Sequence, residues 1–563
     1  MKKSIQNLPY IFLTILSLVA CSPQPNTNNQ TNADTLKLLY WQAPTILNPH
    51  LSNGFKDSEA SRITLDPLAS YDKNGQLIPF LAAEVPTTEN GGIAADGRSV
   101  TWKLKQGIKW SDGTPFTAAD VVFTYQFISN PNVGATTSGT YNIISNVEAI
   151  DDYTVKVNFK DVTPGWNLVF VGTEGMILPR HKFAEYNGAN SRQAPANLMP
   201  VGTGAYRVVE FKPGDTVVYE QNTEYWEADK TFFQRIELKG GGDATSAARA
   251  VLQTGDADFA YNLQVEAPIL EQLAATGKGQ VIANFGPQVE RIHLNFSDPK
   301  QGSTVEFPHP LFSDPKVRQA FNLAVDRETI TDRLYGDTGK PTANLLVAPQ
   351  QFNSTNINYE FNLEKAAALL DEAGWQDSNS NGIRDKNGVE MTVLFQTSVN
   401  PLRQKTQEIV KQALESIGVG VELKSIDASI FFSGDPANTD TTERFAADLE
   451  MFTTGNTSPD PGAYMKYYTC DTIPQPSNNW SGDNASRYCN PKYDQLWEQS
   501  TKELDPEKRQ QLFIQMNDLL VEEVVAIPVV ARAEVVGVSN SIVGVDPTPW
   551  DLRTWNIAEW KRE

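Results

Sequence analysis

The stretch from residue 200 to residue 226 reads PVGTGAYRVVEFKPGDTVVYEQNTEYW. Gly202 and Gly204 precede a predicted strand over residues 205–211, and a polar turn follows that strand. A dinucleotide-binding loop would place its glycines after a strand and at the start of a helix. The order is reversed here, so the stretch predicts a turn that enters a strand rather than a nucleotide site.

Strand and helix patterns alternate along the rest of the chain. Residues 36–41 predict a strand, and residues 100–104 and 154–159 alternate apolar and polar side chains with the period of a half-buried strand. Apolar spacings of three and four predict helices over residues 118–128, 244–254, 316–334, 363–373, 402–417 and 506–521. Gly418 ends one helix before a strand over 419–423, so the fold class is α/β, with mixed helices and strands.

The composition is that of a globular protein with two to four packed units. The chain has 563 residues, 40% hydrophobic and 20% charged, and its net charge of −21 excludes nucleic acid as a partner. Three Cys and four His, far apart in sequence, cannot build a His-rich or Cys-rich metal centre. No nucleophile elbow and no phosphate loop is present, so the sequence predicts no enzyme.

The first residues carry the pattern of a targeting signal. Lys2 and Lys3 precede a mostly apolar run over residues 10–20, which is too short to span a bilayer. The run ends in Leu-Val-Ala-Cys21, which resembles the bacterial lipobox and makes Cys21 the candidate for lipidation; a plain secretory signal is the alternative. We predict a lipoprotein signal peptide over residues 1–20 and a flexible tether, rich in Asn, Thr, Gln and Pro, over residues 21–35. No later segment has 18 consecutive apolar residues.

The two remaining cysteines belong to a late, Asn- and Ser-rich loop. A lipid-anchored body would face an oxidising compartment, where thiols close into disulfides. Cys470 and Cys489 are therefore candidates for one disulfide, and two independent free thiols are the alternative.

One loop has the spacing of a calcium ligand set. Asp377, Asn379, Asn381 and Asp385 fall at positions one, three, five and nine of DSNSNGIRD, with Gly at position six. Position twelve is Gly388, where the full cage needs a bidentate Glu. An Asx-rich hairpin turn explains the same residues through local hydrogen bonds, so calcium is the only cofactor that the sequence leaves open.

The opening stretch, from Pro200–Tyr206 to Asn222–Trp226, resembles the signature of the cluster-C, or family 5, solute-binding proteins. This is the dipeptide/oligopeptide-binding family of ABC importers. Further segments resemble the same family in order along the mature chain: WSDGTPFTAADV (110–121), AARAVLQTGDAD (247–258), PLFSDPKVRQAFNLAVDR (310–327) and IPQPSNNWSGDNASRYCN (473–490).

The resemblance implies a bilobal fold of the periplasmic-binding-protein type (fold II) with an additional inserted domain. On this chain, lobe I takes residues 36–66, 199–288 and 537–563, inserted domain II takes 67–198, and lobe III takes 289–536. Because the chain leaves lobe I and returns to it, hinge closure over a ligand is the expected motion.

The implied function is capture of a peptide by a monomeric, lipid-anchored protein in the periplasm or cell envelope. The protein would deliver its ligand to ABC permease and ATPase subunits without covalent chemistry. Relatives in the same fold bind nickel chelates, haem, oligosaccharides or opines, so a non-peptide ligand is one alternative. A sensor or chaperone that presents a ligand is another.

The resemblance also implies where the ligand is held. On lobe I, Trp41, Ala43, Pro44 and Thr45 follow the first strand and match a ligand-contacting stretch. On lobe III, Arg403 opens a helix that faces the cleft and is a candidate partner for a ligand carboxylate. Core packing for Trp41 and for Phe452, and a surface helix charge for Arg403, are the alternatives.

The strand end over Phe452, Thr453 and Thr454 matches the place where peptide-binding relatives carry an acidic residue for the ligand's amine. Asn456 occupies that position here, and it contributes no charge. Either Glu450 or Asp460 supplies the charge, or the ligand is not a free-amine peptide.

Overall fold

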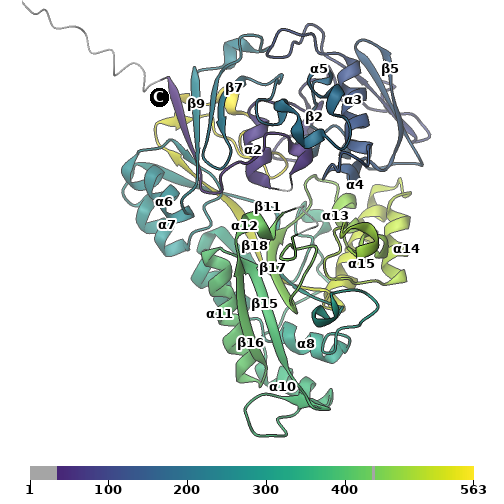
Figure 1. Cartoon of the computed structure of the whole chain (residues 1–563), viewed down its shortest axis with the longest axis vertical. Coiled ribbons are helices and arrows are strands. Elements are labelled where there is room, and N and C mark those ends of the chain that lie inside the picture. The colour runs from purple at the N-terminus through teal and green to yellow at the C-terminus, as the bar shows by residue number, and fades with distance from the viewer. Residues whose placement is uncertain (1–33, 53, 434–437) are drawn as a thin grey trace, which may run out of the picture.

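A single mixed sheet of eleven strands runs through the molecule and joins its two main lobes (Figure 1). The computed structural model describes residues 34–52, 54–433 and 438–563. Across the sheet the strands are β16 (Gly420–Ile426), β15 (Thr392–Ser398), β17 (Leu449–Thr454), β11 (Gly279–Leu294), β18 (Ala526–Ser539), β10 (Phe259–Ala260), β1 (Thr35–Tyr40), β9 (Arg235–Gly240), β8 (Thr216–Gln221) and β7 (Tyr206–Lys212), and β12 (Gly339–Pro341) also pairs with β18.

The described residues also form smaller sheets and fourteen α-helices. The remaining strands are β2 (Ala69–Tyr71), β3 (Leu77–Pro79), β4 (Ser99–Lys103), β5 (Ile144–Asp151), β6 (Thr154–Phe159), β13 (Asp385–Lys386), β14 (Val389–Glu390), β19 (Ile542–Val543) and β20 (Lys561–Arg562). The helices are α2 (Phe55–Arg62), α3 (Ala118–Ser129), α4 (Ser138–Tyr141), α5 (Arg180–Phe183), α6 (Ala244–Arg249), α7 (Ala267–Ala274), α8 (Pro315–Leu323), α9 (Arg327–Ile330), α10 (Leu363–Glu372), α11 (Pro401–Ser416), α12 (Ala428–Phe431), α13 (Gly462–Lys466), α14 (Pro491–Ser500) and α15 (Pro506–Glu522).

The two long strands β11 and β18 connect lobe I to lobe III, and their pairing has a wide break in the middle and a further register shift between Glu290 and Arg291. The register shifts between Phe285 and Val289, which face Ala533 and Ala531. Gly286 sits in this break, where a Cβ would come within 2.6 Å of the Pro549 Cβ, so only glycine fits without movement. A break in both connecting strands is the place where a hinge can bend.

Val535 on β18 pairs with Ala283 and packs into the same core as Leu252 of lobe I. The boundary of lobe III after residue 536 stays a prediction, because apolar residues run through β18 on both sides of the break.

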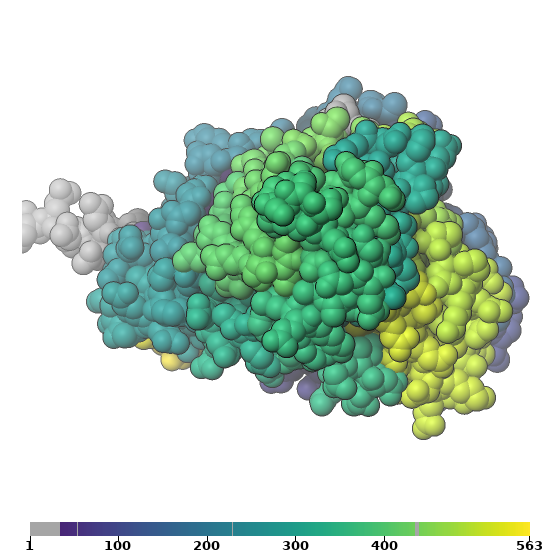
Figure 2. Space-filling model, turned by 90° about the horizontal axis from the view of Figure 1, so that it is seen from below, coloured from purple at the N-terminus to yellow at the C-terminus, as the bar shows by residue number. Residues whose placement is uncertain are grey.

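Lobe III has helices over one face of its sheet. Val317 and Phe321 on α8, Leu370 on α10 and Val410 on α11 belong to the same buried apolar core as Phe395 on β15. A second core joins α13, α14 and α15 beside them. Figure 2 shows this end of the molecule, with green residues forming one continuous surface and the yellow-green region of α14 and α15 to one side.

The single helix predicted over residues 316–334 is wrong, because the structure divides it. α8 ends at Leu323, and Asp326 starts α9 by accepting a hydrogen bond from the backbone amide of Thr329. An Asp that can cap a new helix competes with its own helical position. The Arg327 side chain then donates to the carbonyls of Val325 and Pro528, which holds the break against β18.

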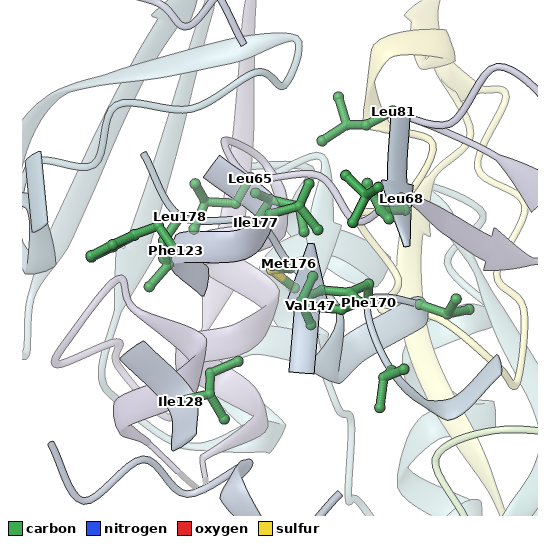
Figure 3. Packing of buried hydrophobic residues seen from close by; sticks show 14 of the residues in the cluster. Leu65, Leu68, Leu81, Phe123, Ile128, Val147, Phe170, Met176, Ile177 and Leu178 are labelled. Carbon is green, nitrogen blue, oxygen red and sulfur yellow. The ribbon is translucent and has the colours of Figure 1, made fainter. Parts of the chain in front are cut away.

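Inserted domain II has its own core of buried apolar side chains. Figure 3 shows Phe123 and Ile128 from α3 near Met176, Ile177 and Leu178. A capping box of Thr117 and Asp120 begins α3. Trp550 and Leu552 from the C-terminal part of the chain also enter this core, which ties the domain to lobe I.

Among the described residues, no helix has the length and apolar character needed to cross a bilayer. The predicted signal peptide, Cys21 and most of the tether lie outside the described residues.

Candidate ligand-binding site

The end of β17 has an unpaired edge. β17 pairs with β11 from Leu449 to Thr454, but its pairing with β15 stops at Met451. Within the described residues, no strand therefore follows Phe452–Thr454 on the β15 side. An extended ligand backbone can add to such an edge by main-chain hydrogen bonds, which are independent of the ligand's sequence.

Buried charges surround Thr453. Its hydroxyl contacts the Glu290 carboxylate and accepts hydrogen bonds from Arg403 Nη2 at 3.1 Å and Arg532 Nε at 3.0 Å. Arg403 also pairs with Glu290 in a bidentate geometry, Nε to Oε2 at 3.0 Å and Nη2 to Oε1 at 3.1 Å. The Asn400 side chain fixes the first turn of α11, which carries Arg403, by capping two backbone amides.

This cluster keeps one net positive charge. Burial would raise the pKa of Glu290, but the Arg403 and Arg532 guanidinium groups and the Thr453 hydroxyl outweigh it and hold that pKa below its ordinary value. One carboxylate thus faces two guanidinium groups. Arg403 is only 5% exposed, so it is not a surface helix charge, and the cluster can attract a ligand anion to the β17 edge.

Asn456 is buried at the turn after β17. Its Nδ2 donates to the Ser458 carbonyl at 2.7 Å, and its Oδ1 has no hydrogen-bond partner in the described part of the chain. Gly455 before it approaches Pro287 so closely that a Cβ would lie 2.1 Å from the Pro287 carbonyl oxygen. The turn is therefore held rigidly against the hinge segment.

Neither of the two predicted acidic alternatives presents a free charge. Both oxygens of Asp460 pair with the Arg509 guanidinium on α15, with Nη2 at 3.0 Å. Glu450 is fully buried, and burial raises its pKa well above the ordinary value, which disfavours its charged form. The amine of a ligand at Asn456 would meet no unpaired charge from these three residues.

The aromatic residue of this strand lies over a buried histidine. The Phe452 ring stacks on His293 with 4.6 Å between centroids, while the Phe452 side chain stays half-buried. Burial lowers the pKa of His293 well below its ordinary value, so the imidazole is neutral. Thr454, also half-buried, gives its carbonyl to the Arg291 guanidinium.

The lobe I residues divide into two groups. Trp41 packs against a lobe I core, and its indole Nε1 donates to the Asn262 carbonyl at 2.8 Å, while Gln264 bonds Asn262 in the same lobe. The segment after it points elsewhere: Ala43 lies against Gly240, the Pro44 carbonyl accepts from Gly214, and Thr45 bonds Asp57 and Lys56. Of this predicted set, only Trp41 is connected through contacts to the β17 region.

Polar contacts join the lobes around the site. Gln264 bonds Asn400 at the start of α11, and Lys405 pairs with Glu266 at 2.7 Å. These contacts link lobe I to the helix that carries Arg403. On the other side, Thr457 after β17 lies 3.5 Å from Glu174 of inserted domain II.

Sequence reasoning missed Glu290 and Arg532, which complete the Arg403 cluster. A signal was present: residues 289–294 read VERIHL, which puts three titratable side chains into one buried strand. Charged groups buried in a strand need partners, and those partners define a site.

Cys470 and Cys489 form a disulfide that closes a loop of the same lobe. In the DSNSNGIRD loop, Asp377 accepts from the amides of Asn381 and Gly382, and Asp385 accepts from Ser378. The described residues hold no group of three or more His, Cys, Asp or Glu side chains placed for a metal ion. The loop oxygens serve local turns, which is the alternative named above, and calcium there stays a prediction.

The fold and site define a class of ligand-binding protein with lobes joined at a hinge. Comparison with known proteins agrees: the sequence profile of the bacterial extracellular solute-binding proteins, family 5 (middle part), matches residues 76–475. The chain belongs to this family and is a solute-binding protein rather than an enzyme.

Two curated relatives cover most of the chain. The oligopeptide-binding protein AppA of Bacillus subtilis is 27% identical over 444 residues, 76% of this chain and 77% of its own. The glutathione-binding protein GsiB of Escherichia coli K12 is 25% identical over 508 residues, 89% of each chain.

Solved structures show the same fold. AppA from Bacillus subtilis in complex with a nonapeptide matches with a TM-score of 0.80 at 24% identity, covering 94% of this chain and 99% of that one. NikZ from Campylobacter jejuni in complex with Ni(L-His) matches with a TM-score of 0.79 at 22% identity, covering 94% and 100%. The predicted fold class is thereby confirmed.

Proposed function

We propose that this chain is the substrate-binding subunit of a peptide-type ABC importer. It captures a ligand between lobe I and lobe III by bending at the β11–β18 break, and it delivers the ligand to the permease. It acts as a monomer outside the cytoplasmic membrane, anchored by a lipid on Cys21 after removal of residues 1–20.

The observation that carries the peptide assignment is the unpaired β17 edge beside the buried Arg403–Glu290–Arg532 cluster. The edge offers backbone groups to a peptide backbone, and the net positive charge attracts a peptide carboxylate. The names of AppA and GsiB, an oligopeptide and a glutathione binder, support the same ligand class.

A non-peptide ligand is the second candidate, and Asn456 favours it. This residue stands where peptide-binding relatives are expected to carry an acid, and Glu450 and Asp460 do not replace the charge. A chelate such as the nickel–histidine complex bound by NikZ, a haem, an oligosaccharide or an opine would need no amine partner.

Native mass spectrometry of the protein purified from its host distinguishes the two candidates. A ladder of bound masses that differ by amino-acid residues supports peptides, whereas one repeated small mass supports a dedicated ligand. Loss of uptake on deletion of the gene supports an importer, and loss of a transcriptional response with normal uptake indicates a sensor.

The lipid anchor needs a separate test. Cys21→Ser is expected to release the protein from the membrane fraction and to abolish incorporation of radiolabelled palmitate. Unchanged membrane attachment of this variant would exclude lipidation at Cys21.

A further inference from the structure

Three polar side chains form one row across the lobe III sheet, next to the unpaired β17 edge. His293 on β11 faces Glu450 on β17, and Glu450 faces Gln396 on β15. Residues that face each other on neighbouring strands point to the same side of a sheet, and the strands lie about 4.8 Å apart. We refer to His293, Glu450 and Gln396 as the polar row.

The polar row is buried inside lobe III. Gln396 and Glu450 are 0% exposed, and His293 is 4% exposed. The Ser486 hydroxyl contacts His293 Nδ1 at 3.1 Å at one end of the row. The contact between the row and the β17 edge is the Phe452 ring, which stacks on the His293 ring.

Each member of the polar row has one polar atom without a partner. Within the described part of the chain, Glu450 Oε1, Gln396 Oε1 and His293 Nε2 are buried and make no hydrogen bond. Inside the row, Gln396 Nε2 donates to Glu450 Oε2 at 2.5 Å. Buried polar atoms without partners cost free energy, so three of them on facing residues indicate one shared partner.

The hydrogen-bond roles of the three atoms follow from their neighbours. The Ser486 hydroxyl donates to the Val525 carbonyl, so it accepts from His293 Nδ1 and leaves Nε2 with a free lone pair. Gln396 Oε1 is a second acceptor, because the amide nitrogen of Gln396 is the donor to Glu450. Burial of Glu450 raises the pKa of its carboxyl and favours a proton on Oε1, which makes this atom a donor.

One water molecule matches these three roles. It accepts a hydrogen bond from the Glu450 acid and donates two, to Gln396 Oε1 and His293 Nε2. Buried waters typically make about three hydrogen bonds to groups that lack protein partners. A metal ion matches them less well, because no three His, Cys, Asp or Glu side chains of the described residues come together for one.

We propose that His293 and un-ionised Glu450, bridged by one internal water, position the Phe452 ring at the β17 edge for ligand binding. This inference rests on the proposed function, and both groups are positioning residues that act through Phe452. The Phe452 ring stacks on His293 at 4.6 Å and packs edge-on against Phe432. A His293 ring that loses its bridge can turn, and the stacked Phe452 ring turns with it.

Calorimetry with the tripeptide Ala-Phe-Ala tests the positioning role. Glu450→Leu removes both hydrogen-bonding oxygens and should weaken binding at least fivefold. Glu450→Gln restores a donor and an acceptor in the same shape, so it should recover wild-type affinity within twofold. Equal losses in the two variants, or no loss in either, would overturn the proposal.

Two further variants control this comparison. Glu422→Leu makes the same chemical change at an exposed position of β16 and should leave the Kd unchanged. If Glu450→Leu does not fold, His293→Phe takes its place, because it keeps an aromatic ring beside Phe452 and removes Nε2. The same fivefold loss is expected from His293→Phe, and wild-type affinity of this variant would contradict the proposal.

Histidine ¹⁵N NMR tests the polar row without a ligand, so it separates this inference from the proposed function. His293, assigned by its loss in His293→Phe, should stay neutral with its proton on Nδ1 from about pH 5 to 8, because burial lowers its pKa. A proton on Nε2, or titration of this ring in that range, would refute the bridge. If wild type binds no peptide, the peptide assignment fails while this test still decides the row.

Urea unfolding against pH gives a readout that packing alone would not produce. Folded Glu450 keeps a proton that the unfolded chain releases above its ordinary pKa of about 4.3, so wild type should lose stability relative to E450Q as the pH rises. The ratio of their unfolding constants should change by up to about tenfold per pH unit. The charged groups that act on Glu450 and His293 are Glu443, Arg487 and Arg291, which both proteins share. A constant ratio from about pH 5 to 8 would show that Glu450 is ionised and overturn the proposal.

Discussion

Replacing Glu290 with Gln tests the charge cluster behind the β17 edge. The change preserves volume but leaves Arg403 and Arg532 without their shared carboxylate, while the Arg403 and Glu290 side chains are only 6% and 1% exposed. Removing one partner from a buried ion pair costs about 3–5 kcal/mol, because the remaining charge stays desolvated. We expect the free energy of unfolding of lobe III to fall by about 4 kcal/mol.

Urea unfolding followed by tryptophan fluorescence measures this loss. The matched control is Glu220→Gln, which breaks the Arg207–Glu220 pair with side chains 44% and 43% exposed. Exposed pairs contribute about 0–1 kcal/mol, so the control should lose little or no free energy of unfolding. Equal, small losses in both variants would refute the view that Glu290 is a buried counter-ion.

The dependence of the free energy of unfolding on pH in the acidic range tests the same interaction. The arginines hold the pKa of Glu290 below its ordinary value of about 4.3. The stabilising contribution is therefore complete above that value and is lost as the pH falls through the lowered folded-state pKa. Glu290→Gln should flatten stability against pH in this range, and an unchanged slope would contradict the assignment.

Three further predictions concern the surrounding loops. Asn456→Asp should raise the affinity for free-amine peptides by about tenfold in calorimetry, as expected for a charge-assisted hydrogen bond. It should also lower stability, because the new carboxylate faces the Ser458 carbonyl. Unchanged Kd values would remove this position from the amine site. Replacing Cys470 and Cys489 with Ser should cost about 3 kcal/mol in reversible unfolding, since the two are 19 residues apart, and no loss would show that the loop is ordered without the bond. Calcium should leave the melting temperature unchanged, because Asp377 already caps loop amides; a rise that Asp377→Ala abolishes would establish an ion site.

Local structure was predictable where one strong pattern acts alone. The strand β6 has the bounds expected from its period-two alternation, and α3 begins at its Thr117–Asp120 capping box. The helix over residues 316–334 failed because Asp326 offers a competing helix start, a choice decided by the contact of Arg327 with Pro528. Helix propensity, which depends on neighbouring residues, carries no information about a contact with a residue about two hundred positions away.

The candidate site residues came from the resemblance, but the charges around them did not. The resemblance led to Phe452–Asn456 and to Arg403, and the structure places β17 beside the start of α11. The partners that set the charge there are Glu290 and Arg532, which lie 113 and 129 residues from Arg403 in sequence. The sequence alone does not show which of these side chains lie together, so the net charge of the cluster is known only from the fold.

The hinge and the site share the same two residues of β18. Arg532 joins the Glu290 cluster of lobe III, and Glu534, two residues later, pairs with Arg553, which also binds Glu59 of lobe I. The wider register break lies between Ala531 and Ala533 of β18, at Arg532 itself. Under the proposed hinge motion, the Glu290 cluster moves relative to the pairing of Glu59 and Glu534 with Arg553 in lobe I. Binding drives closure only where a ligand contacts the closed form more favourably than the open form.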